Sequence, residues 1–173
     1  MITLRELSSW ERRIGEIVRR QTGSLEEREQ ALVLQGVYAE YGAVFRSYVQ
    51  LISEDDSGLE ALKRATFLVW YDAVEPACLT GIGELPETDV RLTLESLDRR
   101  CRASPVDAEL QFMIPWYVSV APFAIARVPG MANVEALAGS VREPAKHLPR
   151  DARDFQDRGL MGEYWSALID RAR

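Results

Sequence analysis

The chain has 173 residues and a mass of 19.6 kDa, which is enough for one domain with a hydrophobic core and short for two. Apolar residues make up 47% of the sequence and charged residues 28%, a composition that excludes a disordered or fibrous chain. With 21 Lys and Arg against 27 Asp and Glu, the net charge is −6. This charge disfavours binding to nucleic acid, because such affinity comes mainly from neutralising phosphates.

The cysteine and histidine content limits metal and redox chemistry. Cys78 and Cys101, together with His147, are too few for a four-ligand structural zinc site without carboxylates, so we expect no metal site and no cofactor. The first residues carry charge from Arg5 onward and lack the apolar stretch of a secretion signal. We therefore expect a cytoplasmic protein whose two thiols are free.

Apolar residues recur at helical spacing through the first third of the chain. They predict an amphipathic helix over about 4–18. Ser24, with Glu27 three residues later, forms a capping-box pattern that predicts the start of a second helix. The apolar spacing then continues without a break, so we expect one long central helix over about 24–53. The apolar residues of this helix are Leu34, Val37, Tyr38, Tyr41, Val44, Phe45, Tyr48 and Ile52.

The next segment contains two further helices and a loop. Ser57 and Glu60 repeat the capping-box pattern and predict a third helix. Pro76 ends that helix, because the residue before a proline is pushed out of helical geometry. The residues between Pro76 and Pro86 include two glycines and show no helical period, which predicts an ordered loop. A fourth helix follows over about 87–102.

A long uncharged stretch dominates the second half. Ser104 is expected to cap a fifth helix with Pro105 at its first position, and Pro115 is expected to kink or split that helix. Residues 110–126 carry no charge over 17 positions, close to the length of a membrane span. Because this stretch contains two prolines, we interpret it as a buried core helix, and we expect no membrane contact.

Two weaker helical patterns complete the chain, over about 134–141 and 159–172. No alternating strand pattern, internal repeat or linker composition is apparent. The sequence therefore predicts an all-α fold in a single domain over residues 1–173. We expect a bundle of six or seven helices around the long central helix over about 24–53.

Acidic residues are concentrated in the middle third. Between Glu40 and Asp98 there are 12 acids and 4 bases, a local net charge of −8. Such a surface attracts cationic partners and raises their association rate. We therefore expect a protein–protein interaction module that binds a basic partner through an acidic face within 40–98, for example as an inhibitor or immunity-type neutraliser. The binding residues expected on this face are Glu54, Asp55, Asp56, Glu84 and Glu87.

The segment Trp70–Leu85 supports an alternative function. Asp72 and Glu75 are neighbours if both are helical. Repulsion and burial push the pKa values of paired carboxylates apart, as acid–base chemistry requires. The alternative is an enzyme or small-molecule-binding protein with a pocket where the third helix meets the glycine loop. Glu75 would be the acid or base, with Asp72 as its partner and Tyr71 or Trp70 in the wall. A purely structural role for both acids, tied to arginines or loop amides, stays open.

Other catalytic arrangements find no support. His147 lies in a proline-flanked stretch that is typical of a solvated loop, so no catalytic residue is expected outside the alternative above. The two glycines of the 76–86 loop lack the third glycine and the preceding strand of a phosphate-binding loop. The expected partner is therefore a protein. Self-association through small residues is left open, at Gly36, Ala43 and Ser47.

Overall fold

Every regular element in the computed structural model is a helix, which confirms the predicted all-α fold. The structure describes residues 2–54, 57–83, 85–147, 149 and 151–171. The longer helices of the first half are α1 (Leu4–Arg20), α2 (Leu25–Leu34), α3 (Val37–Leu51), α4 (Gly58–Val74) and α6 (Glu87–Cys101), with the short α5 (Ala77–Thr80) before α6. The second half contains α7 (Leu110–Val120), α8 (Pro122–Ile125), α9 (Ala132–Gly139), the 3₁₀ helices η1 (Pro144–His147) and η2 (Ala152–Phe155), and α10 (Gly159–Arg171).

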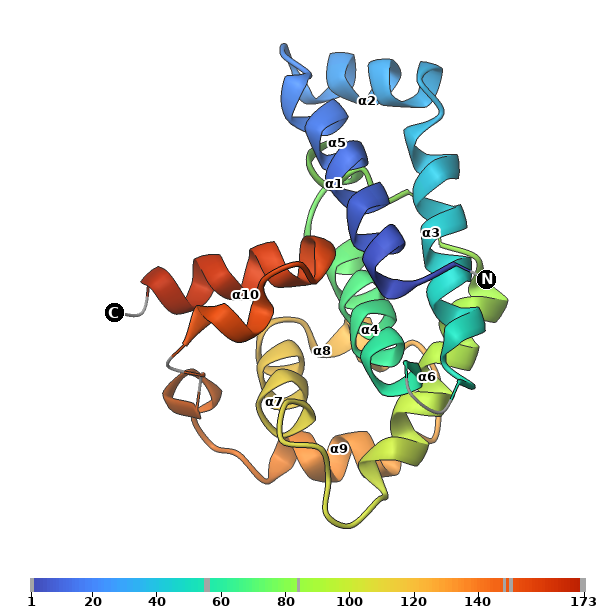
Figure 1. Cartoon of the computed structure of the whole chain (residues 1–173). Helices are drawn as coiled ribbons and strands as arrows, with labels where there is room; N and C mark the ends of the chain where they lie inside the picture. Colours follow the sequence, from blue (N-terminus) through green and yellow to red (C-terminus); the bar gives the residue numbers. More distant parts are fainter. Residues whose placement is uncertain (1, 55–56, 84, 148, 150, 172–173) are drawn as a thin grey trace.

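Helix α4 lies at the centre of the bundle, with α3, α6, α8 and α10 packed against it (Figure 1). Eleven of its 17 residues are buried, as expected for a helix surrounded by others. Helix α2 crosses one end of the molecule beside the ends of α1 and α3, while α7 and α9 occupy the opposite end. The buried apolar side chains form one connected core that reaches from α1 to α10.

The predicted continuous helix over 24–53 is wrong, because the chain turns between α2 and α3. The capping box at Ser24 is present as predicted. Gly36, however, adopts a left-handed backbone conformation with φ of 70°, which ends α2 and redirects the chain. Leu34, predicted to be buried, is consequently 87% exposed at the end of α2. The central helix is α4, and the described residues contain more helices than the six or seven expected.

The third and fourth helices have the predicted positions, with local differences. Ser57 precedes α4 but makes no side-chain capping hydrogen bond, because its backbone is in the right-handed helical region and not extended. The carboxylate of Glu60, which would complete the capping box, binds Arg64 and Arg158. Helix α4 ends at Val74, just before Pro76, as predicted. The loop expected after Pro76 begins with the single helical turn of α5.

The predicted start of the fifth helix is also wrong. Helix α7 begins at Leu110, after Asp107, whose Oδ1 accepts the backbone N–H groups of Glu109 and Leu110 at 3.0 and 3.1 Å. Pro115 lies inside α7, and the helix continues to Val120. The helical conformation is interrupted at Ala121 instead, directly before Pro122, where α8 begins.

Candidate functional site

A groove of about 790 Å³ opens between α2, α3, the end of α4 and the chain that follows α5. It lies beside the junction of the third predicted helix with the glycine loop, but Glu75, around which the alternative hypothesis placed its pocket, does not line it. The residues that line it are Glu29, Val33, Tyr38, Ala39, Gly42, Arg46, Asp72, Ala77, Gly83, Leu85, Pro86, Glu87 and Arg127.

Close packing of the glycine loop on α3 forms one wall of the groove. A Cβ atom on Gly83 would lie 2.5 Å from the Cβ of Tyr38, so only glycine lets the loop approach this closely. The Tyr38 hydroxyl is buried and has no hydrogen-bond partner among the described residues. Burial and the nearby charge of Glu29 raise the pKa of Tyr38, so the phenol stays neutral and remains a hydrogen-bond donor.

The charged residues of the groove are of both signs. Asp72 Oδ2 lies 3.6 Å from Arg127 Nη1, and this ion pair is partly shielded from solvent. Glu29, Glu87 and Arg46 are exposed. Among the described residues the lining therefore contains three acids and two arginines, and one of those arginines is already paired with an acid of the groove.

The structure separates the two acids of the alternative hypothesis. Glu75 is not helical: it follows α4 in an extended conformation. It lines a different hollow of about 460 Å³, formed with Tyr71 of α4 and with residues of α10 that include Glu163 and Tyr164. Asp72 faces the groove instead. The two carboxylates therefore do not line a common hollow.

Of the residues predicted for the acidic binding face, the structure describes only Glu54 and Glu87. Asp55, Asp56 and Glu84 lie outside the described residues. Glu54 and Glu87 are both exposed. Glu87 is the first residue of α6, whereas Ser53, next to Glu54, lines a hollow with the C-terminal turn of that helix. A helix of this length spans roughly 20 Å, so the structure does not bring Glu54 and Glu87 together.

Several other acids of the 40–98 segment make internal contacts. Glu40 accepts hydrogen bonds from Trp10 Nε1 at 2.9 Å and from Arg13 at 3.3 Å. Asp98 Oδ1 accepts the N–H groups of Asn133 and Val134 at 2.9 and 3.1 Å, and so holds the start of α9. These contacts remove part of the negative charge that the sequence assigned to one surface.

A network of ion pairs, which the sequence did not indicate, lies inside the protein. Arg158 Nε donates to Glu60 at 2.7 Å, and its two terminal nitrogens donate to Glu109 at 2.7 and 2.8 Å. Lys63 Nζ also lies 2.8 Å from Glu109. Burial of Glu109 opposes its charge, but the contacts with Arg158 and Lys63 outweigh this effect and lower its pKa to about 2. The network ties α4 to the chain before α7 and to the chain before α10.

The network continues to α1 through Arg64. Arg64 Nε donates to Glu60 at 2.6 Å, and its Nη1 lies 3.4 Å from the hydroxyl of Tyr48. Tyr48 donates to Glu11 at 2.5 Å, and Glu11 also accepts the N–H of Leu160 at 2.7 Å. Burial raises the pKa of Glu11, and the hydrogen bonds from Tyr48 and Leu160 and the charge of Arg64 oppose that rise. Glu11 thereby holds the first turn of α10.

This network does not line the groove. It joins α1, α4 and the segments before α7 and α10, so we interpret its role as structural. The sequence contained one signal for it: Glu11 follows Leu7 and precedes Ile14 and Val18 on the apolar stripe of α1. A carboxylate on such a stripe must find partners inside the protein. Those partners are distant in sequence: the Leu160 N–H that Glu11 accepts lies 149 positions away.

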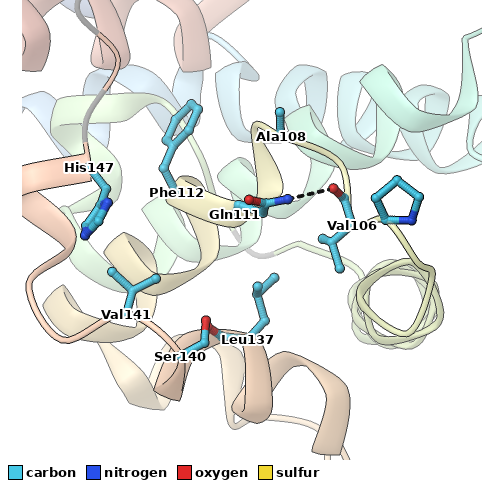
Figure 2. Close-up of a pocket in the computed structure, with 9 residues that line it drawn as sticks. Val106, Ala108, Gln111, Phe112, Leu137, Ser140, Val141 and His147 are labelled. Carbon is cyan, nitrogen blue, oxygen red and sulfur yellow. Dashed lines mark hydrogen bonds between the residues drawn. The ribbon is translucent and has the colours of Figure 1, made fainter.

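A third hollow, of about 580 Å³, contains the single histidine (Figure 2). It lies between the start of α7, the end of α9 and η1, with His147 on the opposite wall from Val106. The Ser140 hydroxyl donates to the carbonyl of Leu137 at 2.7 Å, and Gln111 Nε2 donates to Val106 O at 2.9 Å. Within the described ranges, no hydrogen bond joins His147 to Ser140, so these two side chains form no nucleophile–base pair.

The thiols and the possible metal ligands show no reactive arrangement. Cys78 and Cys101 are free and buried. Burial, together with the charge of Asp98, raises the pKa of Cys101 to about 12, so this thiol is a weak nucleophile. The described residues contain no group of three or more His, Cys, Asp or Glu side chains placed to hold a metal ion.

Comparison of the chain with protein-family models, with curated proteins and with solved structures finds no match in any of the three. In the part of the chain that the structure describes, no helix combines the length and the apolar character needed to cross a membrane. The function proposed below therefore rests on the geometry of this chain alone.

Proposed function

We propose that this protein is a protein–protein interaction module that binds a positively charged partner through the groove beside α2. The observation that supports it best is the composition of that groove. Exposed carboxylates at Glu29 and Glu87 lie beside the exposed apolar side chain of Val33 and the buried, unpartnered hydroxyl of Tyr38. A binding surface with an apolar centre and a charged rim is typical of protein interfaces.

The charges of the groove favour a cationic partner. Asp72 and Arg127 pair with each other, and this leaves Glu29 and Glu87 against Arg46 in the described lining. The net charge of −6 of the whole chain attracts the same partner at longer range. Neutralisation of a basic enzyme in the cytoplasm is one role that this chemistry would serve.

Capture of partners from a lysate of the organism that encodes the protein tests the proposal. The bait is the full chain, compared at about 50 mM and about 300 mM salt, because the higher concentration screens exposed charges. We expect one basic protein that is retained at low salt and lost at high salt. Glu87→Lys should reduce its capture, while Glu143→Lys should not, because Glu143 lies outside the groove and is well exposed. Equal capture by both variants would contradict the proposal.

The hollow beside Glu75 supports a second candidate function, the binding of a small molecule. Its volume of about 460 Å³ is within the range of small-ligand sites. Burial and the charge of Glu75 raise the pKa of Tyr71, which keeps this phenol a hydrogen-bond donor in the wall. A thermal-shift screen of the wild type and of Glu75→Gln checks this candidate. It requires a ligand that stabilises the wild type and fails to stabilise the variant.

A further inference from the structure

Helix α2 has an outward face that nothing in the structure covers. Only Leu32 of its ten residues is buried. Leu25, Glu29 and Val33 are spaced four residues apart and therefore form one ridge along the helix. All three are exposed, as is Leu34 on the adjacent ridge. A helix of ten residues is marginal in water unless a packed face stabilises it, so α2 would gain from a partner on this side.

The exposed apolar side chains are concentrated around this helix. Of the seven large apolar side chains that are exposed among the described residues, three are on α2 and a fourth, Leu79, is on α5. Helix α5 packs against α2, so Leu79 lies on the same end of the molecule. Clusters of this kind on a protein surface mark interaction sites more often than isolated apolar residues do.

The charges on the outward face of α2 are negative. Glu26 and Glu29 are both exposed, while the carboxylate of Glu27 is held by the N–H of Ser24 at 2.7 Å. The one cation of the helix, Arg28, is half-buried, and its Nε is fully buried. The free surface therefore combines leucine and valine side chains with carboxylates. Its complement is a surface of apolar residues flanked by lysine or arginine.

The ridge on α2 leads directly into the groove. Glu29 and Val33 belong to both, and the far wall of the groove adds Leu85, Pro86 and Glu87. From Leu25 to Val33 the ridge is about 12 Å long, or two helical turns. All described regular structure is helical, so no strand edge is offered for pairing with an extended peptide.

From these features we infer that α2 and the adjoining groove bind an amphipathic, positively charged helix of the partner protein. Apolar residues on one face of that helix would pack between the Leu25–Val33 ridge and Leu85. Its lysine or arginine residues would lie opposite Glu26, Glu29 and Glu87. This inference rests on the proposed function and adds the form of the partner and the helix that receives it.

A synthetic peptide tests the inference directly. The probe is a peptide of about five helical turns that carries leucine on one face and lysine on both sides of that face. Its fluorescence anisotropy is measured against the full-length protein. Two control peptides have the same length: one contains a central proline that prevents helix formation, and the other has glutamate in place of lysine. We expect the lysine peptide to bind and both controls to bind at least about tenfold more weakly.

Protein variants locate the site. The double variant Val33→Ser with Leu34→Ser should weaken binding of the lysine peptide by about tenfold or more, since the bound helix would bury both apolar side chains. Glu29→Arg should weaken it as well and reduce its salt dependence. The matched controls are Leu92→Ser and Glu95→Arg, because both residues are exposed on α6 and lie outside the groove. Unchanged melting temperatures would show that each variant is folded.

The outcomes separate this inference from the proposed function. Binding that is equal for the helical and the proline peptide, or equally weakened by the α6 controls, overturns the inference. If no peptide binds but lysate capture still depends on Glu87, the helical partner is wrong and the proposed function stands. If light scattering shows self-association that Leu34→Ser abolishes, a second copy of the chain binds the exposed face of α2, and the inference of a basic partner helix is wrong.

Discussion

Glu109 offers the sharpest test of the buried ion-pair network. Its carboxylate contacts both Arg158 and Lys63, and these contacts lower its pKa from 4.5 to about 2. The substitution Glu109→Gln keeps the size and shape of the side chain and removes the charge. Arg158 and Lys63 then keep only Glu60 and Asp107 as anionic partners.

The pKa shift of Glu109 sets the expected magnitude. A folded-state pKa that is lowered by about 2.5 units corresponds to about 3 kcal/mol of stability, which is fully present above pH 4.5. This contribution is lost as the pH falls from 4.5 toward 2, because the carboxylate is then protonated in both states. The free energy of unfolding of the wild type should therefore exceed that of Glu109→Gln by about 3 kcal/mol at pH 7 and by about 1 kcal/mol at pH 3.

Urea unfolding followed by circular dichroism at pH 7, 5 and 3 measures this difference. The control variant is Glu143→Gln, whose ion pair with Lys146 is exposed and should contribute less than about 0.5 kcal/mol at every pH. A difference in unfolding free energy between wild type and Glu109→Gln that does not change with pH would refute the electrostatic reasoning. If Glu109→Gln loses no more unfolding free energy than Glu143→Gln does, the network does not stabilise the fold.

Three further predictions concern packing and backbone geometry. Leu68→Ala or Phe45→Ala should each cost roughly 2–5 kcal/mol, because both side chains are buried in the core; unchanged melting temperatures would contradict this. Gly36→Ala should lower the free energy of unfolding by about 1–2 kcal/mol through the left-handed backbone alone, since no atom lies near the added methyl group. Gly36→Asn should lower it less, because asparagine adopts this conformation more readily. Equal urea midpoints for the two variants would argue against this explanation. Gly159→Ala should cost more than Gly36→Ala in the same assay, because its Cβ would lie 2.6 Å from Glu11 Oε2 as well.

Helix positions were largely predictable from local patterns. The helices over Leu4–Arg20, Gly58–Val74 and Glu87–Cys101 follow from apolar spacing and from terminating residues such as Pro76. The capping box at Ser24 was visible for the same reason, since its two hydrogen bonds involve residues only three positions apart. The break at Gly36 was missed because apolar residues recur at helical spacing on both sides of it.

The candidate site was predictable only in part. The alternative hypothesis placed a pocket around Glu75 with Asp72 as its partner, and the predicted acidic face included Glu87. Asp72 and Glu87 line the groove, but Glu75 does not. It did not indicate α2 as part of the site, because a continuous helix over 24–53 would have buried Leu34 in the centre of a bundle. The turn at Gly36 instead leaves that residue exposed at one end of the molecule.

The sequence by itself determined the helical class, most helix boundaries and the excess of acid, because each of these depends on neighbouring residues or on composition alone. Only the tertiary structure decided which charges face water. Glu60 and Glu109 are half-buried against Arg64, Lys63 and Arg158, and the farthest of these partners lies 98 positions from the acid it binds. Glu11 is buried and is held by Tyr48 and the N–H of Leu160. Burial of a charge requires such partners, and local sequence patterns contain no information about which distant residue will supply them.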